Sequence, residues 1–108
     1  MTQTCISDAI EILEELSACL DDAYWEAATI GDKDRFYNLI YAINRELSEL
    51  SKLSVQDHNL AYERISQEFT QAKERLSDLK KSPETYVRRS RTAQNLSDCL
   101  HRLDQLLR

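Results

Sequence analysis

Apolar residues recur every three or four positions from residue 6 to residue 30, without a miss. This spacing gathers them on one face of an α-helix, whereas a strand, with its period of two, would scatter them over both faces. Other parts of the chain have to cover a face this long, so the pattern predicts a helical bundle. The stripe consists of Ile6, Ala9, Leu13, Leu16, Leu20, Ala23, Ala27 and Ile30.

Composition also favours helices. The 108 residues include one Gly and one Pro, fewer turn residues than sheets and loop-rich folds need, and 31% of them are charged. The length fits a single domain over residues 1–108 with one core. We therefore expect an all-α antiparallel four-helix bundle, with helices at about residues 5–30, 33–52, 55–81 and 83–107.

Turn and capping residues predict where these helices begin and end. Gly31 follows the first stripe as a left-handed C-cap, and Asp32 is expected to cap the second helix. Ser54 marks the start of the third helix, and Ser82-Pro83 the start of the fourth. Because no Gly or Pro enforces a break near residues 51–54, the alternative is three helices with one long central helix that dimerises.

Three further apolar stripes predict which faces of the later helices are buried. The second stripe consists of Phe36, Ile40, Ile43, Leu47 and Leu50, flanked by Leu39 and Leu53. The third consists of Val55, His58, Tyr62, Ile65, Phe69, Ala72, Leu76 and Leu79. The fourth consists of Ala93, Leu96, Leu100, Leu103 and Leu107.

Charge is unevenly distributed along the chain. Residues 1–32 carry eight acids and no base, whereas residues 73–108 carry nine bases and five acids, within a net charge of -5. An antiparallel bundle places the first helix beside the fourth, so we expect the acids at residues 21–26 to face a basic patch at residues 88–91. The alternative is that this patch binds RNA or DNA, which the acidity of the whole chain disfavours. The patch consists of Arg88, Arg89 and Arg91.

The sequence offers little support for an enzyme or a cofactor. Neither His58 nor His101 lies three residues after a Glu, as a di-iron bundle requires, and one Gly excludes a glycine-rich phosphate loop. His58 is expected to be a hydrogen-bonded core residue. The cysteines, Cys5, Cys19 and Cys99, form no CxxC motif, so we expect reduced thiols rather than a disulfide framework or a zinc site. We therefore predict a non-enzymatic protein without cofactor or metal.

The cellular location of the protein can be predicted from its apolar runs and its first residues. No apolar run approaches the roughly 18 residues that a membrane span needs. The first residues are acidic and carry no Lys or Arg, unlike a secretory signal. We expect a cytoplasmic protein with no membrane contact.

Five of the eight aromatic residues lie between residues 24 and 41. Several of them fall off the predicted stripes, and the start of the fourth helix brings one more aromatic to the same end of the bundle. Exposed Trp and Tyr are typical anchors for a binding partner. The alternative is an aromatic plug that closes the bundle end. The candidate partner-binding residues are Tyr24, Trp25, Tyr37, Tyr41 and Tyr86.

The segment WEAATIGDKDRFYNLIYAINREL, with Gly31-Asp32, Phe36, Leu39 and Arg45-Glu46-Leu47, resembles the first hairpin of flagellar export chaperones of the FliT and FlgN type. The resemblance implies a small helical protein that shields an aggregation-prone helix of an export substrate, with a fourth helix that can cover the binding groove. We therefore expect a protein-binding helical bundle of this kind. The alternatives are an architectural homodimer and a small nucleic-acid-binding regulator.

Overall fold

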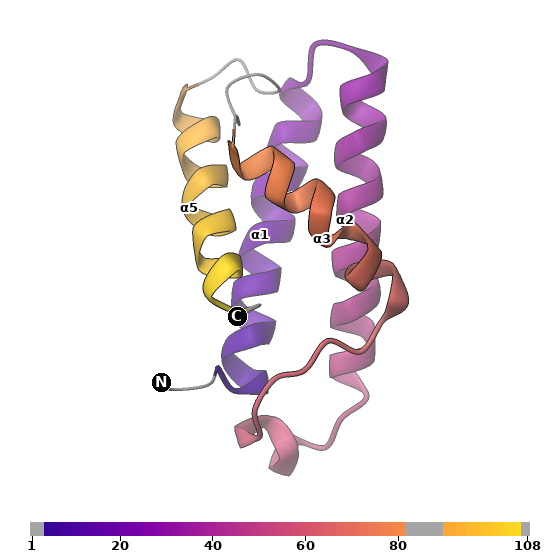
Figure 1. The fold of residues 1–108 in the computed structure, drawn as a ribbon, viewed down its shortest axis with the longest axis vertical. Coiled ribbons are helices and arrows are strands. Elements are labelled where there is room, and N and C mark those ends of the chain that lie inside the picture. Colours follow the sequence, from indigo (N-terminus) through magenta and orange to yellow (C-terminus); the bar gives the residue numbers. More distant parts are fainter. Residues whose placement is uncertain (1–3, 82–89, 107–108) are drawn as a thin grey trace.

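The chain folds into an all-α four-helix bundle, as the sequence predicts (Figure 1). The structure is a computed structural model that describes residues 4–81 and 90–106. Within these residues there is no β-sheet, and a short 3-10 helix lies between the second and third α-helices. The elements are α1 (Ile6–Glu26), α2 (Ile30–Ser51), η1 (Val55–Asn59), α3 (Gln67–Lys81) and α5 (Ser90–Leu106).

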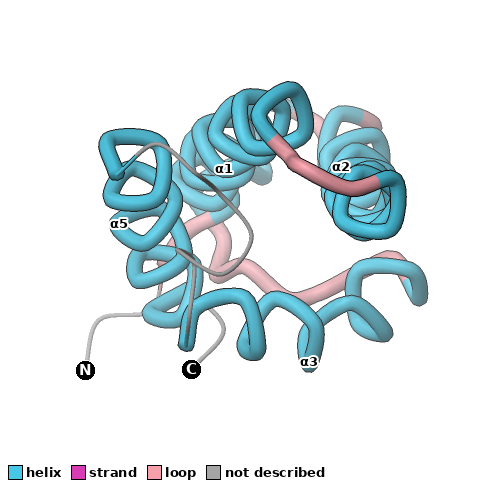
Figure 2. Tube along the Cα trace, turned by 90° about the horizontal axis from the view of Figure 1, so that it is seen from above, coloured by secondary structure: helices cyan, strands magenta, loops and turns pink. Residues whose placement is uncertain are grey.

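Three of the helices lie side by side, and the fourth crosses them. α1 lies between α2 and α5, and all three follow the long axis of the molecule (Figure 1). α3 runs obliquely from α2 to α5 and closes the open side of this layer (Figure 2). The predicted contact between the first and last helices is confirmed.

α1 forms the centre of the core because it packs against two neighbours. Its stripe is buried from Ile6 to Ala27, as predicted. Half-buried residues widen the stripe towards α2 on one side and α5 on the other, which is consistent with the two contacts of α1. These flanking residues are Ile10, Ile12, Cys19 and Tyr24.

The turn between α1 and α2 differs from the prediction. α1 ends at Glu26, and α2 starts at Ile30 with Thr29 as its N-cap, whose hydroxyl accepts a hydrogen bond from the Asp32 amide at 3.1 Å. Gly31 therefore lies in the first turn of α2, and it has no positive φ angle. The threonine competes successfully for the cap because its side chain satisfies an amide that would otherwise lack a partner.

The buried face of α2 is rotated from the predicted stripe. Ile40 and Leu47 are only half-buried, while Leu39, Ala42 and Glu46 are buried instead. The rotation follows from α3 and the segment before it, which pack on this side of α2 (Figure 2). Ala42 lies beside Ala72 of α3, and Glu46 accepts hydrogen bonds from the amides that precede α3. Phe36, Ile43 and Leu50 are buried, as predicted.

The expected third helix begins twelve residues late. The break after α2 is confirmed, which excludes the long central helix, and Ser54 does cap the next element by accepting a hydrogen bond from the Gln56 amide at 3.3 Å. That element is only the short η1, and residues 60–66 are extended. Tyr62 is half-buried and Ile65 is exposed, so neither belongs to a helical stripe.

The extended segment is held at both ends. Near its start it pairs with the beginning of α1, where the Ile6 amide donates to the Leu60 carbonyl at 2.9 Å and the Tyr62 amide donates to the Thr4 carbonyl at 2.8 Å. These bonds use backbone groups that a longer third helix would have satisfied internally. The backbone therefore has an alternative to helix formation here, and α3 is confined to Gln67–Lys81.

The other end of the segment is held by a buried carboxylate. Glu46 is fully buried on α2 and accepts hydrogen bonds from the Tyr62 hydroxyl at 2.5 Å, the Ile65 amide at 2.9 Å and the Ser66 amide at 2.7 Å. Ser66 in turn accepts from the Phe69 amide at 3.2 Å, which caps α3. Burial and the hydrogen bond to Glu46 raise the pKa of the Tyr62 hydroxyl above its usual range, so it stays a donor.

Gly31→Ala should stabilise the protein by about 0.4–1 kcal/mol, because a helical glycine loses more backbone freedom on folding than alanine does. A Cβ at this position would meet only the Thr29 hydroxyl, at 3.9 Å, which is an ordinary contact. Urea unfolding monitored by circular dichroism gives the change. A loss of stability would instead indicate the left-handed C-cap.

Glu46→Ala should lower the free energy of unfolding by about 2–4 kcal/mol, because it leaves buried amides without an acceptor. Glu46→Gln keeps one acceptor oxygen and should cost about half as much. Urea unfolding is again the measurement. The control is Glu49→Ala, which removes surface ion pairs to Arg45 and Lys52 and should change stability by less than about 1 kcal/mol. Equal losses at the two positions would contradict the role of Glu46.

Candidate functional site

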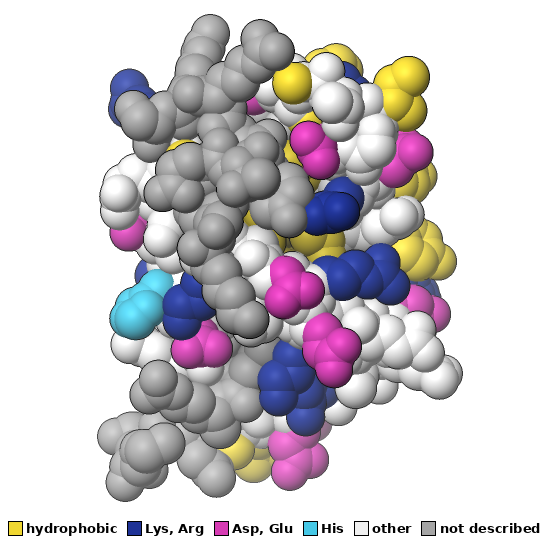
Figure 3. Space-filling model, turned by 45° about the horizontal axis from the view of Figure 1, so that its top comes forward, with side chains coloured by type: hydrophobic (Ala, Val, Ile, Leu, Met, Phe, Trp, Pro, Cys, Tyr) yellow, Lys and Arg dark blue, Asp and Glu magenta, His cyan; other side chains and the backbone are white. Residues whose placement is uncertain are grey.

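Large apolar side chains are exposed where α1 turns into α2. Trp25 is 72% exposed, Ile30 79%, Tyr37 60% and Tyr41 53%. Figure 3 shows hydrophobic side chains, in yellow, at the upper right of the molecule, on the side of α2. We refer to Trp25, Ile30, Tyr37 and Tyr41 as the hairpin-end patch.

The helical period of α2 places three members of this patch on one face. Tyr37 follows Ile30 by seven residues and Tyr41 follows Tyr37 by four, so the three side chains lie along one side of the helix. The core residues Phe36, Leu39 and Ile43 point elsewhere. Ile30 was predicted in the α1 stripe, which is wrong, because α1 ends before it and the helical phase restarts at α2.

Lys33 connects Trp25 to the first turn of α2. Its ammonium donates to the Tyr24 carbonyl at 2.8 Å and lies 4.8 Å from the centre of the Tyr24 ring and 5.8 Å from that of Trp25. The same carbonyl accepts a hydrogen bond from the Ala27 amide at 3.3 Å, and a cation at the end of α1 interacts favourably with the helix dipole. It supplies the C-terminal interaction that was predicted for Gly31.

Tyr24 and Trp25 have different roles. Their rings meet edge to face, with centroids 5.2 Å apart and planes at 87°. Tyr24 is half-buried and packs against the core, whereas Trp25 projects outwards from it. The plug alternative therefore fits Tyr24, and the exposure expected for a partner surface is found at Trp25.

A shallow groove continues the patch across α2 towards α3. Tyr41 forms one edge of it and Ala42 and Ala72 its floor, while polar side chains of α3 form the opposite edge. The small side chains of Ala42 and Ala72 do not fill the space between α2 and α3, so the groove stays open. The polar residues along α3 are Glu68, Gln71 and Arg75.

The other predicted residues are divided between described and undescribed segments. Tyr86, Arg88 and Arg89 lie outside the described residues, as does the Ser82-Pro83 helix start. Arg91 is exposed near the start of α5. An ion pair of Glu15 with Arg102 joins α1 to α5. It lies earlier on α1 and later on α5 than the predicted contact between residues 21–26 and 88–91.

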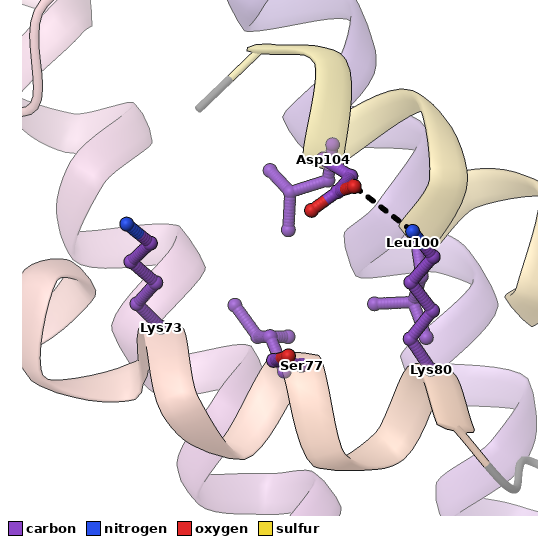
Figure 4. Close-up of a pocket in the computed structure, with 7 residues that line it drawn as sticks. Lys73, Ser77, Lys80, Leu100 and Asp104 are labelled. Carbon is purple, nitrogen blue, oxygen red and sulfur yellow. Dashed lines mark hydrogen bonds and ion pairs between the residues drawn. The ribbon is translucent and has the colours of Figure 1, made fainter. Parts of the chain in front are cut away.

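The helix proposed as a cover, α5, packs its apolar face fully into the bundle. It packs closely on α1, while a small pocket of about 70 Å³ opens between it and α3. In Figure 4, Lys80 and Asp104 meet across this opening, 2.9 Å apart, above Leu100. The pocket is well below the roughly 300 Å³ of ordinary ligand sites, so we regard it as a packing gap. The buried residues of α5 are Ala93, Leu96, Cys99, Leu100, Leu103 and Leu106.

Groups that could carry chemistry are scattered. In the described parts of the chain, no three His, Cys, Asp or Glu side chains cluster as a metal site would require. His58 is half-buried in η1 instead of on a helix, and its buried Nε2 has no hydrogen-bond partner among those residues, contrary to the prediction. None of the helices in residues 4–81 and 90–106 combines the length and apolar character of a membrane span.

Comparison with known proteins finds no matching family model, no similar curated protein and no similar solved structure. The resemblance to flagellar export chaperones therefore stays a prediction from the sequence.

The fluorescence of Trp25 reports directly on the patch, because it is the only tryptophan in the chain. We expect a red-shifted emission that acrylamide quenches almost as efficiently as free tryptophan. Trp25→Ala should change the free energy of unfolding by less than about 1 kcal/mol, since the side chain is largely in water. The contrast is Tyr24→Ala, which removes a half-buried ring and should cost about 2–4 kcal/mol. A blue-shifted, protected emission would contradict this placement.

Proposed function

We propose that this chain is a non-enzymatic protein-binding bundle whose contact surface is the hairpin-end patch. The observation that carries the proposal is the exposure of Trp25, Ile30, Tyr37 and Tyr41, which extend from the α1–α2 turn to the middle of α2. An exposed group of large apolar residues loses free energy when a partner covers it. Trp and Tyr are also the residues that most often dominate binding energy at protein interfaces.

An amphipathic helix is the partner that best fits this surface. The three side chains lie along one side of α2, where the exposed Asp34 separates Ile30 from Tyr37. Amphipathic helices bind such apolar surfaces through residues at intervals of three and four. The adjoining groove offers Glu68, Gln71 and Arg75 to polar side chains at the edge of that helix. Both charge signs are present there, so the polar contacts would orient the partner.

More specifically, we propose that the chain acts as an export chaperone. A protein of this class keeps an aggregation-prone helical segment of a flagellar or type III secretion substrate covered in the cytoplasm until delivery. Binding at the hairpin-end patch would leave α5 in place, with its apolar face still on α1. This arrangement differs from displacement of the fourth helix, which the sequence resemblance implies.

In the test, the wild-type protein and the Tyr37→Ala/Tyr41→Ala variant are each used as bait in a lysate of the source cells, and the proteins that they retain are compared. A protein retained by the wild type is then purified, and its affinity is measured by calorimetry. We expect the double variant to bind at least about tenfold more weakly, because two interface tyrosines are truncated. The control is Leu60→Ala/Ile65→Ala, which removes exposed apolar side chains outside the patch and should leave binding unchanged.

Chaperone activity has its own readout. Light scattering should show that the partner aggregates alone and stays in solution with the wild type, but not with the tyrosine variant. Self-association that disappears in the tyrosine variant, without any bound protein, would indicate the architectural homodimer instead. Steeply salt-dependent retention on RNA or DNA would indicate the nucleic-acid-binding regulator.

A further inference from the structure

Two cysteines from opposite ends of the sequence meet between α1 and α5. The sulfur atoms of Cys19 and Cys99 lie 2.9 Å apart, within hydrogen-bond contact, although eighty positions separate them in the chain. Both are free thiols. Cys5, the third cysteine, lies in front of the first turn of α1 and pairs through its backbone with Ala61.

The surroundings hold these two sulfurs together. Cys19 also lies 3.8 Å from the Asn95 carbonyl on α5, and Cys99 lies 3.9 Å from the Glu15 carbonyl on α1. Each thiol thus has a polar contact on the opposite helix, and the ion pair of Glu15 with Arg102 fixes the same alignment. Cys99 is buried, whereas Cys19 is half-buried and open to a reagent from one side.

We propose that Cys19 and Cys99 form a reversible redox site, in which a small-molecule disulfide such as oxidised glutathione converts the two thiols into an intramolecular disulfide. The Cys19 thiolate attacks one sulfur of the reagent and releases one small thiolate. The Cys99 thiolate then attacks the Cys19 sulfur of the mixed disulfide and releases the second. The two protein thiols lose two electrons and two protons, and the reagent leaves as two thiols.

The local environment slows the oxidation of this pair. Burial, the hydrogen-bond contact with Cys99 and the nearby carboxylates of Asp22 and Glu15 raise the pKa of the Cys19 thiol to about 12. Few thiolates are then present at neutral pH, and exchange is slow because the thiolate is the attacking species. The site therefore responds to sustained oxidation and does not oxidise freely.

The bond would link the first helix to the last. It would close a loop of about eighty residues, and cross-links of long loops restrict the unfolded chain most strongly. In the thermodynamic cycle that links the two processes, the free energy by which the disulfide stabilises the fold equals the free energy by which folding favours disulfide formation. We expect the oxidised protein to melt about 10 °C or more above the reduced protein.

The experiment measures disulfide formation in glutathione redox buffers at mildly alkaline pH, with and without urea. Cys5→Ser is the working background, and Cys19→Ser and Cys99→Ser in that background are the controls. We expect a product lighter by two hydrogens, with a peptide that joins Cys19 to Cys99, and neither control should form it. The equilibrium constant in native buffer should exceed that in urea by at least about a hundredfold.

Two results would overturn the proposal. One is separate glutathione adducts with no bond between Cys19 and Cys99 in the folded protein. The other is an equilibrium constant that urea leaves unchanged, which would mean that the fold does not bring the sulfurs together. The measurement involves no partner, so its outcome is independent of the proposed binding function.

Discussion

The buried carboxylate of Glu46 determines where the second half of the bundle begins. It collects donors from Tyr62, Ile65 and Ser66, and through Ser66 it sets the first residue of α3. A buried carboxyl group is costly unless its oxygen atoms are hydrogen-bonded. The need for these donors therefore restricts the course of the backbone over residues 60–66. The oblique direction of α3, and the groove beside Tyr41, follow from that starting point.

The sequence predicts the parts of the fold that depend on periodicity alone. The buried stripe of α1 is predicted from Ile6 onwards, because every third or fourth residue is apolar. The break after α2 is predicted by a different signal, Ser54 as the start of the next helix. The turn between α1 and α2 is harder to predict from the sequence. Gly31 indicates the end of one helix, whereas Thr29, two positions earlier, indicates the start of the next. The threonine provides a hydrogen bond that the glycine cannot, and this choice moves Ile30 from the core to the surface.

Other features depend on contacts that sequence spacing does not encode. Glu46 lies within an amphipathic helix, where a carboxylate ordinarily faces water. Its hydrogen-bond donors are sixteen to twenty residues away, so the sequence around Glu46 does not predict its burial. The same reasoning applies to residues 60–66, whose apolar spacing imitates a helix although backbone bonds to α1 make it extended. The candidate site was partly predictable, because Trp25, Tyr37 and Tyr41 lie off the stripes. The Cys19–Cys99 contact needed the exact alignment of α1 with α5, for which Glu15 with Arg102 is the guide.

The side-by-side placement of α1 and α5 also has a consequence for synthesis of the chain. The α1–α2 hairpin is complete once Ser51 has left the ribosome, but the side of α1 that faces α5 has no cover until Ser90–Leu106 has also emerged. Contacts between such distant segments form late, after a costly loop closure. During translation, the apolar side of α1 that faces α5 is therefore exposed to whatever binds nascent chains, and the synthesis of α5 supplies the residues that cover it.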